Sequence, residues 1–162
     1  MATSAIMIPD FPLPPSQNEL YRNVPGVGRV ATKALKDYRN TVSRWAFANA
    51  KYRVLFEVIR EEEWGGTSIF KVDTYFIFKH ERIWTKDLKP KRLDASNRIK
   101  ACHDYLCDFL GIDDKQIWNC SAEKLSGEKE GVVILISPIA PMTSVELLEQ
   151  FSDNEEKVQI EQ

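Results

Sequence analysis

Residues 68–79 read SIFKVDTYFIFK, a run of β-branched and aromatic residues in which polar and apolar side chains partly alternate. Such a run is typical of a β-strand, and its apolar density predicts a strand in the centre of a sheet. The sequence on either side therefore has to supply the neighbouring strands and the helices that cover them.

A charged loop, a helix and two strands are predicted after this central strand. Residues 81–93 are charged, and Asp94 then stands where a helix N-cap is expected. Apolar side chains follow at helical spacing at Ile99, Cys102, Leu106 and Phe109 or Leu110. Gly111 predicts the end of this helix, and Asp113 and Asp114 predict a turn. Residues 116–125 and 132–137 predict two strands, joined by a turn over 126–130.

A short edge strand and a long helix are predicted before the central strand. Residues 6–16 lead from that strand into a proline-rich loop, and Gly26 and Gly28 mark a turn. From residue 31 the apolar positions have helical spacing, and the helix can run on to residue 59, although 52–59 also fit a strand. The order predicts an α/β (α+β) fold, a small mixed sheet with two main helices in one domain over residues 1–138.

The charge of the chain is divided unevenly. The formal net charge of the 162 residues is −2, but residues 139–162 carry six acids and one base, so residues 1–138 carry 21 bases and 18 acids. The segment 139–162 is predicted to be a disordered acidic tail.

Residues 1–10 have no basic region and only a short apolar stretch, so we expect no signal peptide, no membrane span and a cytoplasmic protein. The three cysteines lack the spacing of a zinc site or a disulfide framework.

Basic residues gather in two places, which are candidate contacts to nucleic-acid phosphates. They are Arg22, Arg29, Lys33 and Lys36 near the proline-rich loop, and Lys86, Lys89, Lys91 and Arg92 in the charged loop. The simpler interpretation of such a run is a solvated loop.

Polar residues of the second helix share one face. A helical projection places Asn97, Lys100 and Asp104 together, with Asp94 at the same end. Carboxylates of this kind can hold Mg²⁺, and a nearby lysine can stabilise the charge of a phosphodiester transition state. A surface helix with an N-cap and a Lys100–Asp104 ion pair is the simpler alternative.

Three separated motifs resemble the RusA family of Holliday-junction resolvases. They are PLPPSQNELYR at 12–22, GRVATKALKDYRNTV at 28–42, and a block that combines 94–100 with Asp104 and GIDDKQ at 111–116. The resemblance covers residues 6–138 in the same order. It implies a homodimer that cuts four-way DNA junctions symmetrically on two strands, with Mg²⁺, or Mn²⁺ in its place, as the cofactor.

The resemblance also implies roles for individual residues. Asp94 matches the first catalytic aspartate, Lys100 the essential lysine and Asp114 the last aspartate, with Asp113 beside it as a further metal ligand. The family pattern has a second aspartate where this chain has Ser96, which is followed by the expected Asn97. A hydroxyl is a weaker Mg²⁺ ligand than a carboxylate, so either Asp104 or Asp113 compensates or cleavage is reduced or absent.

Two further hypotheses stay open. The chain is then either a protein that binds branched DNA without cutting it, or an unrelated α/β interaction domain. The length of the second helix adds an expectation about assembly: Asp94 and Asp113 lie about 24 Å apart along it, too far to share one ion. In a two-fold dimer with antiparallel helices, the Asp94 end of one helix would lie next to the Asp113 end of the partner's helix. In the simpler case only one end of the helix is catalytic.

Overall fold

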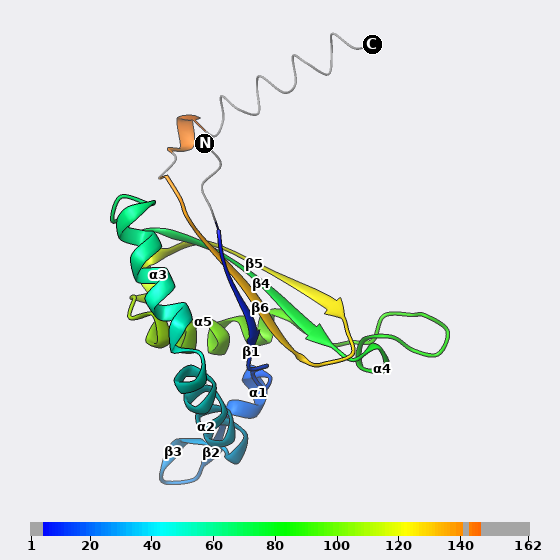
Figure 1. The fold of residues 1–162 in the computed structure, drawn as a ribbon. Coiled ribbons are helices and arrows are strands. Elements are labelled where there is room, and N and C mark those ends of the chain that lie inside the picture. Colours follow the sequence, from blue (N-terminus) through cyan, green and yellow to red (C-terminus); the bar gives the residue numbers. More distant parts are fainter. Residues whose placement is uncertain (1–4, 141–142, 147–162) are drawn as a thin grey trace, which may run out of the picture.

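A four-stranded mixed sheet forms the centre of the computed structural model, which describes residues 5–140 and 143–146 (Figure 1). The strand order is β1-β6-β4-β5. The strands are β1 (Ile6–Phe11), β4 (Phe70–Phe78), β5 (Ile117–Ser126) and β6 (Gly131–Pro138). β4 is parallel to β5 and antiparallel to β6, so residues 68–79 do supply an inner strand, as predicted.

One face of the sheet carries the main core. The side chains of β4 alternate strictly, and those at even positions are buried. They pack in one cluster with side chains from α2 (Lys33–Ala48), α3 (Ala50–Glu62) and α5 (Ser96–Leu110), among them Val42, Phe56 and Leu106. The predicted mixed sheet covered by helices is therefore confirmed.

The long N-terminal helix is two helices. α2 begins at Lys33, where Thr32 accepts a hydrogen bond from the Leu35 amide, and it ends before Asn49. Both the backbone N–H and the side-chain amide of Asn49 donate to the Trp45 carbonyl, which closes α2 before α3 starts. The alternative of a strand over 52–59 is wrong, because those residues lie within α3.

A small hairpin was missed by the sequence analysis. The turn marked by Gly26 and Gly28 is present, with both glycines at positive φ, but its flanks form β2 (Tyr21–Val24) and β3 (Gly28–Ala31). The helix expected from residue 31 is thus preceded by a strand. Short helical turns α1 (Gln17–Leu20), α4 (His80–Ile83) and η1 (Asp114–Gln116) also went unpredicted as helices.

α5 connects the two parallel strands β4 and β5. It begins at Ser96, and Ala95 rather than Asp94 occupies the N-cap position, which corrects the predicted cap by one residue. Asp94 nevertheless contacts the start of α5, because its carboxylate accepts a hydrogen bond from the Ser96 amide at 3.0 Å. Gly111, at φ 70°, ends the helix as predicted, since this left-handed conformation suits glycine.

The proline-rich loop is fastened to the helices. Arg98, buried in α5, donates to the Pro14 carbonyl, and the Tyr38 hydroxyl in α2 donates to the Pro12 carbonyl at 3.4 Å.

At the end of the described residues, the side chain of Glu146 accepts hydrogen bonds from the amide and hydroxyl of Thr143. Most of the predicted acidic tail lies outside the described residues. Among those described, no helix is long and apolar enough to cross a membrane.

A buried polar pair joins α5 to β4 and gives a stability prediction. Thr74 Oγ1 and His103 Nε2 lie 3.0 Å apart, both residues are buried, and burial lowers the pKa of His103. Thr74→Val should lower the free energy of unfolding by about 1–3 kcal/mol, because the imidazole loses its partner in the core. Urea denaturation measures this change.

Thr41→Val is the matched control, because the Thr41 hydroxyl donates to the Asp37 carbonyl on an exposed helix face. It should change the free energy of unfolding by less than about 0.5 kcal/mol. Equal effects of the two substitutions would mean that the Thr74–His103 contact contributes nothing particular to stability.

Candidate active site

One narrow stripe of α5 faces solvent. The exposed positions of the helix are Ser96, Lys100, Asp104 and Asp108, spaced four residues apart, while the rest of it is buried or half-buried. Lys100 Nζ lies 3.5 Å from Asp104 Oδ1, so the ion pair of the simpler alternative is present. Both side chains remain largely exposed, and such a pair adds little stability. Lys100 is therefore available to an incoming anion.

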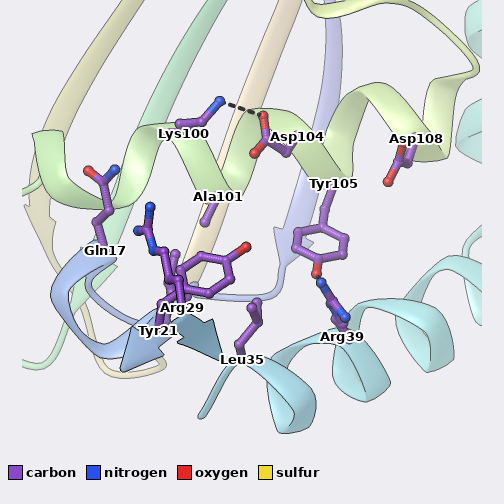
Figure 2. A pocket seen from close by; sticks show the side chains of 11 residues that line it. Gln17, Tyr21, Arg29, Leu35, Arg39, Lys100, Ala101, Asp104, Tyr105 and Asp108 are labelled. Atoms are coloured by element: carbon purple, nitrogen blue, oxygen red, sulfur yellow. Dashed lines mark hydrogen bonds and ion pairs between the residues drawn. The ribbon is translucent and has the colours of Figure 1, made fainter. Parts of the chain in front are cut away.

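The stripe borders a hollow of about 470 Å³ (Figure 2). Lys100 and Asp104 lie on its α5 side, and Tyr21, Arg29 and Arg39 lie opposite, on the hairpin and α2. The Arg29 guanidinium stands 4.3 Å from the centre of the Tyr21 ring, and Arg39 Nε donates to the Tyr105 hydroxyl at 2.7 Å. The hollow thus combines cations with aromatic rings, a combination suited to a nucleic-acid strand.

Asp94 and Ser96 meet at the start of α5. Ser96 donates to Asp94 Oδ1 twice, from its hydroxyl at 2.6 Å and from its amide at 3.0 Å. The hydroxyl is the main reason that the pKa of Asp94 lies below its usual value. Asp94 is exposed, so an ion or a phosphate can reach it. Here Ser96 therefore supports the neighbouring carboxylate instead of adding a second one.

Asp113 and Asp114 follow the other end of α5. Asp113 caps η1, accepts from the Lys115 amide at 3.1 Å and pairs with Lys115 Nζ at 3.0 Å. The hydrogen bond from the Lys115 side chain is the main cause of a lowered pKa of Asp113. Both aspartates are exposed. This end therefore offers two adjacent carboxylates that are accessible from solvent.

The structure does not bring the two ends together within one chain. α5 has 15 residues, which at about 1.5 Å each separate its ends by about 22 Å. Within residues 5–140 and 143–146, no three His, Cys, Asp or Glu side chains are grouped so as to hold a metal ion. One carboxylate at the first end and two at the second still match the donor chemistry of Mg²⁺, which takes one or two carboxylates and completes its shell with water.

The predicted basic residues form two separate groups. Lys86, Lys89, Lys91 and Arg92 lie in the loop that leads to Asp94, and Arg22, Arg29, Lys33 and Lys36 lie on the hairpin and the start of α2, well apart in Figure 1. The loop makes contacts of its own. Lys91 Nζ donates to the Glu81 carbonyl, and Trp84 and Pro90 form an isolated antiparallel β-bridge. Asn97 is half-buried at the start of α5.

Sequence analysis did not single out Tyr21, Arg39, Tyr105 or Asp108 for this site. Asp108 continues the four-residue spacing of Lys100 and Asp104, so the pattern itself could have included it. Arg39 and Tyr105 are 66 residues apart, and only the packing of α2 on α5 joins them.

Comparison with models of protein families places most of the chain in one family. Residues 11–137 match the family described as Endodeoxyribonuclease RusA. No curated protein matches the chain well enough to count as a relative.

The contact between Ser96 and Asp94 gives a prediction about ionisation. Ser96→Ala should raise the pKa of the Asp94 carboxyl toward its usual value, because the mutant has no hydroxyl donor. Ser96→Asp should raise it further, since a second carboxylate disfavours ionisation of the first. A pH titration of the metal-free protein, followed by carbon NMR of the side-chain carboxyls, measures both shifts.

Ser68→Ala serves as the control, because this exposed serine precedes β4 and its carbonyl accepts from Gln116, at the far end of α5 from Asp94. An Asp94 titration that Ser96→Ala leaves unchanged would show that the hydroxyl is not the source of the shift.

Proposed function

The chain belongs to the RusA family of endodeoxyribonucleases, and from this we propose that it resolves four-way DNA junctions by Mg²⁺-dependent nicking of two strands. The observation that supports this proposal best is the exposed line of Asp94, Lys100 and Asp114 along and beyond α5, within the matched residues. We place the activity in the cytoplasm, as a function of recombination and repair.

Asp94, Asp113 and Asp114 are the residues that would hold the cation. When bound, such an ion lowers the pKa of a water molecule and offsets charge that develops on the phosphate. The chain prepares the carboxylates for this role, because hydrogen bonds from Ser96 and Lys115 keep Asp94 and Asp113 ionised. Lys100 would place its ammonium group beside the DNA strand that is cut, where it can stabilise the charged transition state.

Two basic groups would hold the branched DNA around these acids. The charged loop ends at Asp94, so Lys89, Lys91 and Arg92 would contact the phosphates next to the cleaved bond. The second group, on the hairpin and α2, would contact an arm of the junction on the far side of the hollow. A homodimer would present each group twice, as a junction cut on two strands requires.

The alternative function is binding of branched DNA without cleavage. Ser96 favours it, because the family pattern has an acid there and a serine reduces the negative charge available to a cation. A labelled four-way junction separates the two functions: cleavage that depends on added Mg²⁺ supports the nuclease, and binding without nicking supports the alternative.

Substitutions in the proposed catalytic set should separate cutting from binding. Asp94→Asn, Asp114→Asn and Lys100→Ala should each reduce junction cleavage about 100-fold or more, while junction affinity without Mg²⁺ changes little. Single-turnover cleavage and a gel-shift titration on the same junction measure the two quantities.

Asp87→Asn, in the charged loop, is the control and should cut like the parent. Ser96→Asp should keep or raise the cleavage rate, because it restores a ligand. The site assignment is wrong if the three catalytic variants cut at the parent rate.

The salt dependence of binding tests the charged loop. Replacing Lys89, Lys91 and Arg92 together by alanine should flatten the slope of log affinity against log salt by roughly 0.9 for each phosphate that is no longer neutralised. Because Lys91 also donates to the Glu81 carbonyl, the Lys89 and Arg92 double variant separates removal of charge from a rearranged loop.

The matched control removes three exposed cations elsewhere, Arg44, Lys51 and Arg53 on α2 and α3. The control should keep the parent slope. A loop variant with the parent slope would show that the loop does not touch DNA.

A further inference from the structure

The hollow beside α5 has an apolar floor. Leu20, Leu35 and Ala101 line it, and these three residues are buried and form a small hydrophobic cluster. The volume of about 470 Å³ lies within the range of about 300–1,000 Å³ that is usual for sites of small organic ligands. The hollow can therefore hold an organic group with apolar faces, such as a nucleobase, between the charged side chains around it.

The Tyr21 ring and the Arg29 guanidinium form a pair in the wall of the hollow (Figure 2). Tyr21 lies opposite Ala31 in the hairpin, so Arg29 is its diagonal neighbour, and the guanidinium lies 4.3 Å from the centre of the ring. Both side chains are exposed. Aromatic rings and guanidinium planes are surfaces on which unstacked bases stack. Because a base inside a duplex is already stacked on both faces, only an unpaired base can use this pair.

The charges of the hollow are divided between its two walls. Within residues 5–140 and 143–146, neither Arg29 nor Arg39 forms an ion pair with a carboxylate. Asp104 and Asp108 lie across from them on α5, and Asp104 is paired with Lys100 (Figure 2). Guanidinium groups attract phosphates, and carboxylates can accept from the amino groups of bases. The charges therefore favour a nucleotide whose phosphate lies on the arginine side and whose base edge faces α5.

A second hollow, of about 420 Å³, adjoins the first. Gln17, Tyr21 and Arg29 line both hollows, and the second adds Asn18 and Asn23. Amide side chains both donate and accept hydrogen bonds, which suits them to the edges of bases. The Tyr21–Arg29 pair thus borders two places that can each hold a nucleotide. This arrangement fits consecutive nucleotides of one strand better than it fits a free mononucleotide.

We propose that the hollow binds one unpaired nucleotide of the DNA strand at the branch point, with its base on the Tyr21–Arg29 pair and its phosphate next to Arg39. Lys100 lines the same hollow, and the proposed function assigns it to the cleaved phosphate. The nucleotide therefore lies beside the cleaved bond. Unstacking a base costs least where the stack is already interrupted, as it is at a branch point. The hollow then favours branched DNA over a continuous duplex.

The class of ligand rests on the hollow alone, whereas the place of the nucleotide at a branch point rests on the proposed nuclease function. The first test therefore needs neither a junction nor cleavage. Fluorescence anisotropy without Mg²⁺ measures the affinity for a labelled single-stranded oligonucleotide of mixed sequence and for a blunt duplex of the same sequence. Tyr21→Ala should weaken single-strand binding at least about fivefold, because a base loses its stacking surface, and should change duplex binding less than about twofold.

Two variants serve as controls. Tyr21→Phe should keep the parent affinity for the single strand, because the ring remains. Phe47→Ala removes an aromatic side chain that is 89% exposed near the end of α2, outside the hollow, and should also bind like the parent. The proposal is overturned if Tyr21→Ala keeps the parent affinity for the single strand, or if it weakens single-strand and duplex binding equally.

A free deoxynucleoside monophosphate separates a strand site from a mononucleotide site. In competition with the labelled oligonucleotide it should bind at least about tenfold more weakly, because it cannot reach the second hollow and carries fewer phosphates. Equal affinities would assign the hollow to a free nucleotide and overturn the strand assignment.

Abasic sites locate the nucleotide within a four-way junction. Bases near the branch point are removed one at a time, and a gel shift without Mg²⁺ measures the affinity of the parent and of Tyr21→Ala. At the nucleotide that enters the hollow, removal of the base should weaken the parent and leave Tyr21→Ala unchanged, because both changes remove the same contact. Additive effects at every position overturn the placement at the branch point. If the parent neither binds nor cuts a junction, the proposed function fails, and the single-strand measurements still decide whether the hollow binds a nucleotide.

Discussion

Two parallel strands cannot be joined by a tight turn, so the chain between β4 and β5 has to return along the whole length of the sheet. α5 makes this return, packed against β4 on one side and against α1 and α2 on the other. Only one stripe of it is left exposed, and the residues of the proposed catalytic set lie on that stripe or just beyond the two ends of the helix. The crossover thus decides both where the acids are and how far apart they lie.

Neighbouring side chains lower the pKa of two of the acids, Asp94 and Asp113, in the protein without any ligand. The hydroxyl of Ser96 and the ammonium of Lys115 stabilise the ionised forms of Asp94 and Asp113. An acid in place of Ser96 would have the opposite effect in the absence of a cation, because two adjacent carboxylates repel each other. In the proposed cation site the serine would be a weaker ligand than an acid, but it leaves Asp94 as a carboxylate that stays charged.

Sequence patterns predicted the elements whose signals are local. Alternation in β4, helical spacing in α5 and Gly111 at its end all depend on residues close in the chain, and all are present. The hairpin of β2 and β3 was missed because its strands have four residues each, too few for a periodic signal. Asn49 was missed as a helix boundary because asparagine inside an apolar pattern gives only a weak stop. In the site, the stripe could be projected from spacing, but Arg39 on Tyr105 depends on how two helices pack.

The pairing of β1 with β6 limits how far the protein can fold while it is being synthesised. Ile6 lies opposite Ile136, so the first strand to leave the ribosome has no partner until almost the whole domain has followed. At the usual speed of translation this delay is on the order of ten seconds. During that time the proline-rich loop can already be held by Tyr38, but the sheet stays open on one side. The core of this domain therefore stays incomplete until β6 has left the ribosome, because β6 is the strand that β1 pairs with in the described sheet.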